Sequence, residues 1–359
     1  MLSAAQISFF QDPQQRAPAE LLRAWPTLVN VAEAAAAAGV RVTVLQASAH
    51  VQTISRNGVD YHFLPRPASR VGQLKLDVMH VQGFGFAREV LALAALAPGL
   101  PIVLQDHADR PPRRPWRWPL WRRAFGATRG VMFCAADQAQ PFRRRGLLPG
   151  GTRVYEVAES SCRFRPLDRE AARRSTGLVG DPALLWVGHL NANKDPLTVL
   201  EGISRAARQL PGLRLCCCFA SAPLMAAVRA RIEGDPWLAG RVQLLGAVPH
   251  ETIERLMNAA DFLVQGSHRE SSGYALIEAL ACGLPPLVTG IPSFRALTGG
   301  TTGRLWRCGD AQGLADALID LAARPQAPLR AAARARFDQA LSLPALGGRL
   351  RAVYQDLLT

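Results

Sequence analysis

Short apolar runs that favour β-strands alternate with helix-forming stretches along most of the 359-residue chain. In the first half the pattern is regular, with a helical stretch such as 86–97 between successive runs. The strand-like runs there cover 40–45, 59–64, 78–82, 102–105 and 131–134. Such alternation is typical of a mainly parallel sheet with helices on both faces. The sequence therefore predicts an α/β fold.

The first forty residues predict one strand and one helix ahead of that series. Residues 6–10 favour a strand, and a polar loop containing two prolines follows. A single long helix is predicted from about 19 to 38, because an alanine-rich stretch there ends at Gly39. These elements add one more strand–helix step to the sheet.

Alternation restarts after a linker-like stretch at 160–173. Strands are predicted at 184–187, 213–219 and 242–245, and helices at 196–210, 224–232 and 250–259. A chain of this length suits two domains rather than one. We therefore predict two doubly wound domains, at 1–165 and 166–340, with 341–359 as a helix that packs back toward the first. The cleft between the domains is the expected ligand site.

The stretch Ser267–Gly283 is the most informative for function. A strand-like run at 261–265 leads into a polar loop, and a helix begins near Ser272 and Gly273. The next strand, 286–289, follows that helix at once. In such a strand–helix–strand unit the ligand site lies at the carboxyl end of the strand, beside the N–H groups of the helix N-terminus.

Two carboxylates flank this helix start. Glu270 lies in the loop before the helix and Glu278 in its first two turns, so both can face one crevice. A helix N-terminus attracts phosphate, whereas carboxylates bind sugar hydroxyls. Together they predict a pocket for a nucleotide sugar. Taken alone, Glu270 also suits a helix-favouring charge and Glu278 a solvated helix residue, and these interpretations stay open at this point.

The chain is strongly basic, with a formal net charge of +14 and a pI near 10.6. This balance favours anionic partners such as nucleotides, nucleic acid or an acidic membrane face. Arginine supplies nearly all of the positive charge, because lysine occurs only at Lys75 and Lys194. A lysine in a loop of such a chain is therefore a candidate for a specific role.

One segment concentrates the charge with aromatic residues. Residues 110–123 hold six arginines and three tryptophans but no acidic residue. This mixture suits an anionic membrane surface, where tryptophan lies at the headgroup level, and it also suits stacking on nucleic acid. A surface loop whose tryptophans pack onto their own domain is a third interpretation. We expect at most a peripheral membrane contact through 110–123, with nucleic acid the less favoured partner.

The seven cysteines show no spacing typical of a metal site, and three of them are consecutive at 216–218 in a strand-like run. No run reaches the ~18 apolar residues of a membrane-spanning helix, and no secretory leader is evident at the N-terminus. We therefore expect a reduced, cytoplasmic protein, with peripheral contact to the cytoplasmic membrane face as one alternative.

Three motifs in the second half resemble those of the retaining, nucleotide-sugar-dependent glycosyltransferases of family 4, also called group 1. Residues 186–197, Trp-Val-Gly-His-Leu-Asn-Ala-Asn-Lys-Asp-Pro-Leu, resemble the family's Val-Gly-Arg-Leu segment with its downstream lysine. Residues 242–248 resemble its Val-x-Phe-x-Gly segment, and Ser267–Gly283 resembles its Glu-x7-Glu signature. The resemblance implies a GT-B fold, in which two Rossmann-like doubly wound domains face a central cleft.

The resemblance also implies roles for individual residues. The donor site would contain Gly188, His189, Lys194, Ser272, Gly273, Tyr274, Ala275 and Glu278. Lys194 would meet the donor diphosphate, Glu278 the ribose hydroxyls and Glu270 the sugar ring. His189 stands where the family has arginine, and a histidine is shorter and not reliably charged at neutral pH. That departure puts the affinity for the diphosphate in question.

The first half resembles the family more loosely. Residues 77–84 resemble its Asp-Val-x-His-x-His segment, and 101–107 resemble a strand ending in a histidine on the acceptor side. His107 therefore joins Glu270 and Lys194 as an expected catalytic residue. Without the resemblance, a histidine after an apolar strand is more often a hydrogen-bonded structural residue. The family's glycine-rich loop is not visible near 11–18.

The implied reaction is a retaining transfer from a nucleotide-diphosphate sugar to an unidentified acceptor, which could be a glycan, a lipid-linked molecule or a small molecule. No Asp-x-Asp occurs in the sequence, which agrees with a reaction that uses no metal, and no cofactor other than the donor substrate is expected. Three alternatives remain: an epimerase or phosphorylase of the same architecture, a non-catalytic nucleotide-sugar-binding relative, and a basic nucleic-acid-binding protein.

Overall fold

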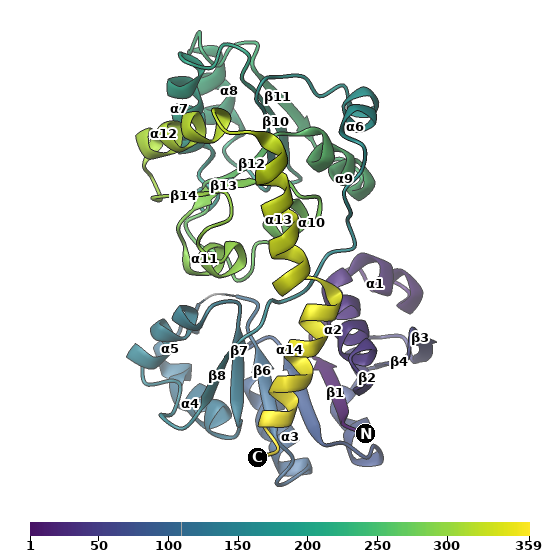
Figure 1. Ribbon diagram of the computed structural model, residues 1–359. Coiled ribbons are helices and arrows are strands. Elements are labelled where there is room, and N and C mark those ends of the chain that lie inside the picture. The colour runs from purple at the N-terminus through teal and green to yellow at the C-terminus, as the bar shows by residue number, and fades with distance from the viewer. Residues whose placement is uncertain (109) are drawn as a thin grey trace. The chain divides into compact units, whose positions relative to one another are not determined.

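The structure is a computed structural model that describes residues 1–108 and 110–359 (Figure 1). Contacts divide the chain into two compact units. The first unit contains Met1–Ser161 together with Ser342–Thr359, and the second contains Cys162–Leu341. Each unit is built on one sheet, eight-stranded in the first and six-stranded in the second, within the described residues. The α/β fold predicted from the alternation is confirmed.

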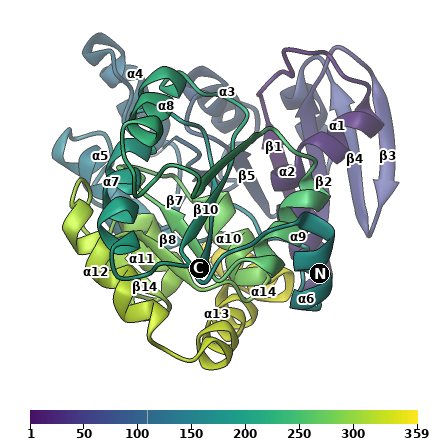
Figure 2. The ribbon, with the colours of Figure 1, turned by 90° about the horizontal axis from the view of Figure 1, so that it is seen from above.

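The sheet of the first unit has the strand order β3-β4-β2-β1-β5-β6-β7-β8. Its strands are β1 Ser3–Ser8, β2 Arg41–Ala47, β3 Gln52–Arg56, β4 Val59–Leu64, β5 Val78–Gln82, β6 Ile102–Gln105, β7 Gly130–Phe133 and β8 Arg153–Glu156. Neighbouring strands are parallel except for β3 and β4, which form an antiparallel hairpin. Figure 2 shows this hairpin at one edge of the unit, beside α1.

The helices of the first unit connect these strands. They are α1 Pro18–Ala24, α2 Pro26–Ala37, α3 Ala87–Leu96, α4 Trp118–Gly126, α5 Gln140–Arg144 and α14 Leu343–Asp356, with short 3₁₀ turns at Pro67–Gln73, Pro115–Arg117 and Ala136–Ala139. The single helix predicted over 19–38 is wrong. Trp25 has φ −117° and ψ 73°, outside the helical region, because a residue before proline is sterically excluded from it. Pro26 then starts a second helix.

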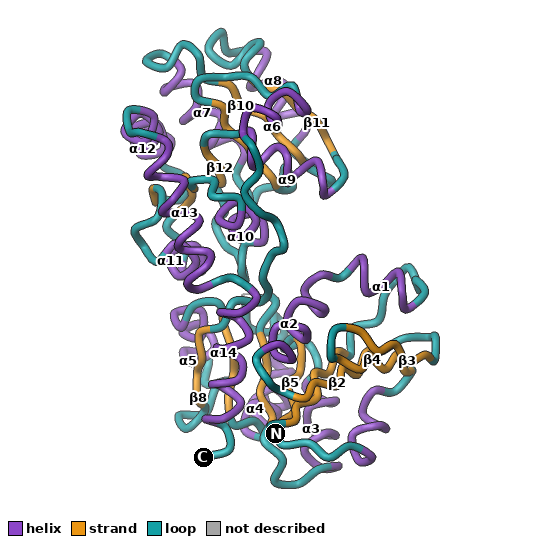
Figure 3. Tube along the Cα trace, turned by 45° about the vertical axis from the view of Figure 1, so that its right-hand side comes forward, coloured by secondary structure: helices purple, strands orange, loops and turns teal. Residues whose placement is uncertain are grey.

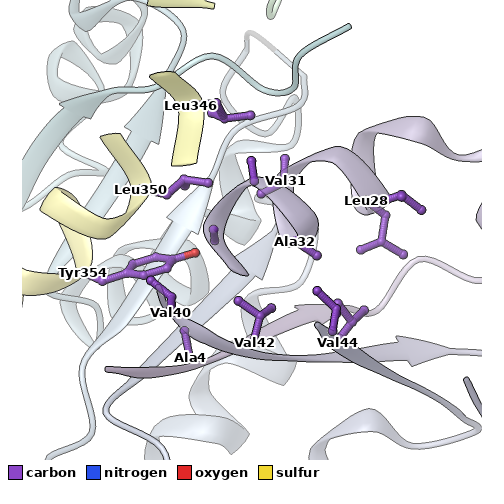
Figure 4. Close-up of a cluster of buried hydrophobic side chains, with 14 of the residues drawn as sticks. Ala4, Leu28, Val31, Ala32, Val40, Val42, Val44, Leu346, Leu350 and Tyr354 are labelled. Carbon is purple, nitrogen blue, oxygen red and sulfur yellow. The ribbon is translucent and has the colours of Figure 1, made fainter. Parts of the chain in front are cut away.

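The final helix α14 completes the core of the first unit. Leu346, Leu350 and Tyr354 are buried against the apolar face of α2 and the strands beneath it, as Figure 4 shows. The Tyr354 hydroxyl lies 2.7 Å from His80 Nδ1 on β5, and Gln6 Nε2 on β1 lies 3.3 Å from the same hydroxyl. The last residues of the chain therefore stabilise the central strands formed by the first residues.

The sheet of the second unit is parallel throughout, with the order β11-β10-β9-β12-β13-β14. Its strands are β9 Ala183–Val187, β10 Arg214–Cys218, β11 Val242–Gly246, β12 Phe262–Gln265, β13 Pro286–Thr289 and β14 Arg304–Trp306. Its helices are α6 Arg169–Thr176, α7 Pro196–Ala207, α8 Met225–Glu233, α9 His250–Ala259, α10 Tyr274–Ala281, α11 Pro292–Thr298, α12 Ala311–Ala322 and α13 Gln326–Ala340. Figure 3 shows its orange strands lying between purple helices.

The linker-like stretch 160–173 contains the start of a helix that the sequence did not predict. Asp168 Oδ1 accepts a hydrogen bond from the N–H of Ala171 at 2.7 Å, which caps α6 from Arg169 onward. The side chains of Arg169 and Arg173 then pair with buried Asp261, just before β12. This ion-pair cluster fixes α6 to the second unit. Among the described residues, no helix is both long and apolar enough to cross a membrane.

Candidate functional site

Two loops of the second unit meet at the carboxyl ends of neighbouring strands. Residues 188–195 follow β9, and residues 266–273 follow β12, its neighbour in the sheet. The chain continues from β9 to β10 on one side, whereas β12 lies on the other, so the strand order reverses here. In open parallel sheets this is where ligands bind.

Hydrogen bonds join the two loops. The backbone N–H of His268 donates to the Asn193 carbonyl at 2.8 Å, and Asn193 Nδ2 donates to the Arg269 carbonyl at 2.9 Å. His268 Nε2 lies 2.9 Å from Asp195 Oδ2. Asp195 has φ +51° and also caps α7 through the N–H of Thr198. The loops therefore form one connected structure rather than two separate segments.

Lys194 and Glu270 form an ion pair where these loops meet. Lys194 Nζ lies 2.5 Å from Glu270 Oε1, and the two side chains are 19% and 14% exposed. The Lys194 backbone N–H donates to Asn191 Oδ1 at 3.0 Å, which closes the turn that carries the lysine. A cation and a carboxylate are thus held side by side, partly shielded from water, where their interactions with a ligand are strengthened.

The N-terminus of α10 opens at the same place. Gly273 has φ +101°, and a Cβ atom there would lie 2.5 Å from Cε1 of Phe294. Only glycine fits this conformation and this space. The N–H groups of a first helical turn have no acceptor within the helix and attract anions. Beside them Ser272 is 1% exposed, and its Oγ has no hydrogen-bond partner in the described part of the chain.

Glu278 lies one turn further along α10 and is engaged by a histidine. Its Oε1 is 2.6 Å from His250 Nε2 at the start of α9. The hydrogen bond to this carboxylate raises the pKa of His250 above its usual value, against a smaller opposing effect of burial. The aromatic ring of Phe164 lies 4.5 Å from the histidine ring. One oxygen of Glu278 is therefore held in place by His250.

His189 follows Gly188 directly and is exposed. Its Nδ1 accepts a hydrogen bond from the backbone N–H of Ser221 at 3.3 Å. The proton of the neutral ring is therefore on Nε2, which is left as a donor. A histidine in this arrangement offers one N–H to a ligand, whereas an arginine would offer a bidentate fork.

Comparison with known proteins decides the family. Residues 181–324, which contain both loops, match the model of the family described as glycosyl transferases group 1. The segment that contains both loops is therefore a group 1 glycosyltransferase domain. The resemblance found in the three sequence motifs is therefore confirmed.

Curated relatives of this glycosyltransferase domain include the D-inositol 3-phosphate glycosyltransferases of Mycobacterium tuberculosis and Mycobacterium bovis. They are 34% identical over 191 residues, which is 50% of this chain and 38% of the relative. The match thus spans well under half the length of those relatives.

Solved glycosyltransferase structures resemble the whole chain in fold. Sucrose-phosphate synthase from Thermosynechococcus elongatus superposes with a TM-score of 0.70 at 20% identity, covering 99% of both chains. HepE from Anabaena, solved with UDP and glucose, gives a TM-score of 0.71 at 15% identity, covering 99% of this chain and all of the other. The two units are the Rossmann-like domains of a GT-B fold.

Of the residues expected in the site, all except His107 belong to the group 1 domain. The structure places Lys194 against Glu270, Gly273 at the N-terminus of α10, and Glu278 within that helix. It adds Asn193, Asp195, His268 and His250, which sequence reasoning missed. The Asp195-Pro196 pair was a usable signal, because aspartate before an N-terminal proline is typical of a helix start.

His107 belongs to the first unit, at the carboxyl end of β6. Its Nε2 lies 2.7 Å from Gln82 Oε1, and its Nδ1 lies 3.4 Å from Glu159 Oε2. Gln82 Nε2 in turn lies 3.2 Å from His80, whose full burial lowers its pKa to about 3. Neutral His80 accepts from the Gln82 amide, which turns Gln82 Oε1 toward His107. Both nitrogens of His107 thus face protein groups.

No three His, Cys, Asp or Glu side chains among the described residues gather closely enough to hold a metal ion. The seven cysteines are free thiols, and six of them are buried. Within the three consecutive ones, burial raises the pKa of Cys217 well above its usual value. The six buried cysteines therefore act as core residues.

The arginine- and tryptophan-rich segment forms one turn and helix α4 of the first unit. Trp121 is buried, and Trp118 Nε1 donates to the Pro112 carbonyl at 3.0 Å, whereas Trp116 is 73% exposed. The Arg122 side chain donates to the Gly146 carbonyl, which brings a second arginine cluster alongside. Nine exposed arginines make up this surface: Arg110, Arg113, Arg114, Arg117, Arg122, Arg123, Arg143, Arg144 and Arg145. We call them the arginine surface.

Proposed function

We propose that the chain transfers a sugar from a nucleoside diphosphate sugar to a hydroxyl acceptor, with retention of the anomeric configuration and without a metal ion. The observation that supports this most directly is the Lys194–Glu270 pair beside the N-terminus of α10. A cation and first-turn amides suit a diphosphate, and a carboxylate suits sugar hydroxyls. The solved relative that contains UDP and glucose makes UDP-glucose the first donor to test.

Each residue of the site has a role in this proposal. Lys194 and the N–H groups of α10 neutralise the diphosphate, and the Nε2–H of His189 adds one hydrogen bond to it. Glu270 accepts hydrogen bonds from the donor sugar. Glu278 binds the ribose through the oxygen that His250 does not hold. The second unit thus binds the donor, and the acceptor binds to the first.

The transfer step needs no covalent protein intermediate. The acceptor oxygen forms a bond to the anomeric carbon as the bond from that carbon to the phosphate oxygen breaks. The electron pair of the broken bond leaves with the diphosphate, which also takes up the hydroxyl proton. Stabilising the departing charge is the main task of the protein, and fixed donors achieve it without reorganisation.

Replacement of Lys194 by alanine tests the proposal, and the chain supplies its own control. With saturating UDP-glucose, Lys194→Ala is expected to lower turnover by about 10²-fold, because one charged donor to the leaving group is lost. Lys75, the other lysine in the chain, lies in the first unit, and Lys75→Ala is expected to leave turnover unchanged. Excess EDTA is expected to leave the wild-type rate unchanged as well.

Unchanged turnover in Lys194→Ala would remove this residue from the site, and a loss of activity in EDTA would overturn metal independence. A protein that binds UDP without turning over any UDP-, GDP- or ADP-sugar would instead be a non-catalytic relative. Salt-sensitive RNA binding with no affinity for nucleotides would support the nucleic-acid alternative.

A further inference from the structure

A pocket of about 540 Å³ opens in the first unit, and none of its lining residues is among those proposed to bind the donor. It lies at the carboxyl ends of β1, β5 and β6 and is closed on one side by the start of α2. The chain order places β2 on one side of β1 and β5 on the other, so this is the switch point of the first sheet. Such a position is where an open α/β sheet binds a ligand.

The walls of the pocket are mainly apolar and aromatic. The rings of Phe10 and Trp25 are in tilted contact with centroids 5.2 Å apart, and Phe84 and Phe86 also line the pocket. The other apolar lining residues include Ala24, Pro26, Leu28 and Ala108. Phe10 is 51% exposed, which leaves aromatic surface in contact with water. Covering that surface with an apolar group is favourable by about 25 cal/mol per Å².

The pocket has few polar side chains. They are Ser8, Thr27, Gln82 and His107, and none of the described lining residues is an arginine, a lysine, an aspartate or a glutamate. A phosphate or carboxylate needs charge-assisted donors in its site. In a chain with 42 lysines and arginines, a pocket lined without them does not fit a phosphorylated ligand.

We propose that the acceptor is a neutral alcohol that carries an apolar or aromatic group, and that this group occupies the pocket formed by Phe10, Trp25 and Phe86. The inference rests on the proposed transfer reaction and names its second substrate class. The polar end of the acceptor lies at Gln82 and His107, whose orientation is fixed by His80 and Glu159. The proposed acceptor carries no phosphate, and in this it differs from the inositol 3-phosphate in the name of the curated relatives.

Three compounds that share one sugar ring test the acceptor class on the full chain. Isothermal titration would compare glucose, glucose 6-phosphate, and n-octyl β-D-glucopyranoside below its micelle concentration. We expect the octyl glucoside to bind with a Kd at least about tenfold lower than either of the others, because its chain covers the aromatic walls. Tighter binding of glucose 6-phosphate than of the octyl glucoside would overturn the proposal.

Two variants locate the binding site. Phe10→Ala removes a half-exposed ring and is expected to raise the Kd for octyl glucoside at least about fivefold, and Trp25→Ala is expected to do the same. Trp237→Ala removes a tryptophan of the second unit that is 38% exposed, and it is expected to leave that Kd unchanged. Equal affinity of all three variants for octyl glucoside would show that its octyl group binds elsewhere, and this result would overturn the inference.

The proposed transfer reaction and the proposed acceptor class can be tested independently. Hydrolysis of UDP-glucose in the absence of acceptor reports on the donor site alone, and Lys194→Ala is expected to impair it whether or not the pocket binds an apolar group. Donor turnover with preferred binding of glucose 6-phosphate would overturn the acceptor class only. Octyl glucoside binding at Phe10 without turnover of any nucleotide sugar would overturn the transfer reaction, and with it the assignment of this ligand as an acceptor.

Discussion

Gly273 determines the direction in which α10 presents its first turn. Its φ of +101° and the nearby ring of Phe294 exclude any side chain at this position. Gly300 offers a matched comparison in the same unit, because its φ is +75° but no atom lies within 4 Å of an added Cβ. The two glycines therefore separate the effect of backbone strain from the effect of a steric clash.

Gly273→Ala is expected to destabilise the protein by about 2–6 kcal/mol, since backbone strain and overpacking each cost about 1–3 kcal/mol. It is also expected to raise the Kd for UDP at least about tenfold, because the first-turn N–H groups of α10 shift. Gly300→Ala should cost only the smaller strain term and leave UDP binding intact. Thermal unfolding and isothermal titration would measure both, and equal UDP affinity in the two variants would contradict this role of α10.

His250, which contacts Glu278 of the donor site, makes the stability of the protein depend on pH. Its pKa is raised in the folded protein, chiefly by the hydrogen bond to Glu278. The stabilisation from this pair is therefore fully present below the ordinary histidine pKa of about 6.5 and is lost as the pH rises through the raised folded value. His250→Asn is expected to flatten the decline of the unfolding temperature above pH 6.5. An unchanged profile in His250→Asn, or an equal change in the His50→Asn control of the first unit, would contradict this assignment.

Sequence reasoning found the charged residues of the site but not what positions them. Lys194 and Glu270 stood out because lysine is rare here and because the motif spacing resembles a known family. Their contact through the loops depends on Asn193 and His268, whose hydrogen bonds join positions more than 70 residues apart. Nothing in local spacing encodes such a pairing, since it arises only when β9 and β12 become neighbours.

Helices α4 and α5, with the turn before α4, place the arginine surface on the first unit. Trp116 is exposed among these arginines, whereas Trp121 anchors the helix in the core. An exposed tryptophan among arginines suits an anionic bilayer, because the ring enters the headgroup region and the arginines meet phosphates. Binding to anionic vesicles is therefore the expected property of this element.

The triple variant Arg113→Ala, Arg114→Ala, Arg117→Ala tests this expectation. It is expected to weaken sedimentation with phosphatidylserine-containing vesicles at least about tenfold, at roughly 1 kcal/mol per arginine. A control that replaces exposed Arg208, Arg229 and Arg255 of the second unit changes the net charge equally and is expected to retain binding. Equal loss in both variants, or binding to RNA in place of vesicles, would contradict a membrane role.

At the level of elements, the parallel strands were predictable because short apolar runs between helical stretches indicate buried strands of a parallel sheet. The split of α1 from α2 was missed because alanine-rich helix propensity outweighed the proline signal at Pro26. The hairpin strand β3 was missed because its residues, Gln52–Arg56, are mostly exposed and polar. An edge strand of this kind is set by pairing with β4 rather than by its own composition.

In the whole molecule, the second unit is formed by one continuous stretch, whereas the first needs the distant helix α14. Removal of 342–359 takes away buried Leu346, Leu350 and Tyr354. Each such loss costs about 2–5 kcal/mol, and the sum reaches the whole stability of a typical domain. The truncated chain is expected to lose the unfolding transition of the first unit and to keep that of the second.

Calorimetry together with hydrogen exchange would measure the two units separately. Removal of only Leu358 and Thr359, which are exposed, serves as the control and is expected to leave both transitions in place. Retention of native protection in β1 and β5 after removal of 342–359 would show that α14 is dispensable.

The position of α14 also sets an order of events on the ribosome. Ser342–Thr359 is synthesised after Cys162–Leu341, so all residues of the second unit have been made while the first unit still lacks a helix. Domains usually fold as they emerge, from the N-terminus onward. Here α14 covers the apolar face of α2 only after it has been translated and has left the ribosome. A nascent chain stalled within 342–359 would therefore expose a site at which chaperones bind.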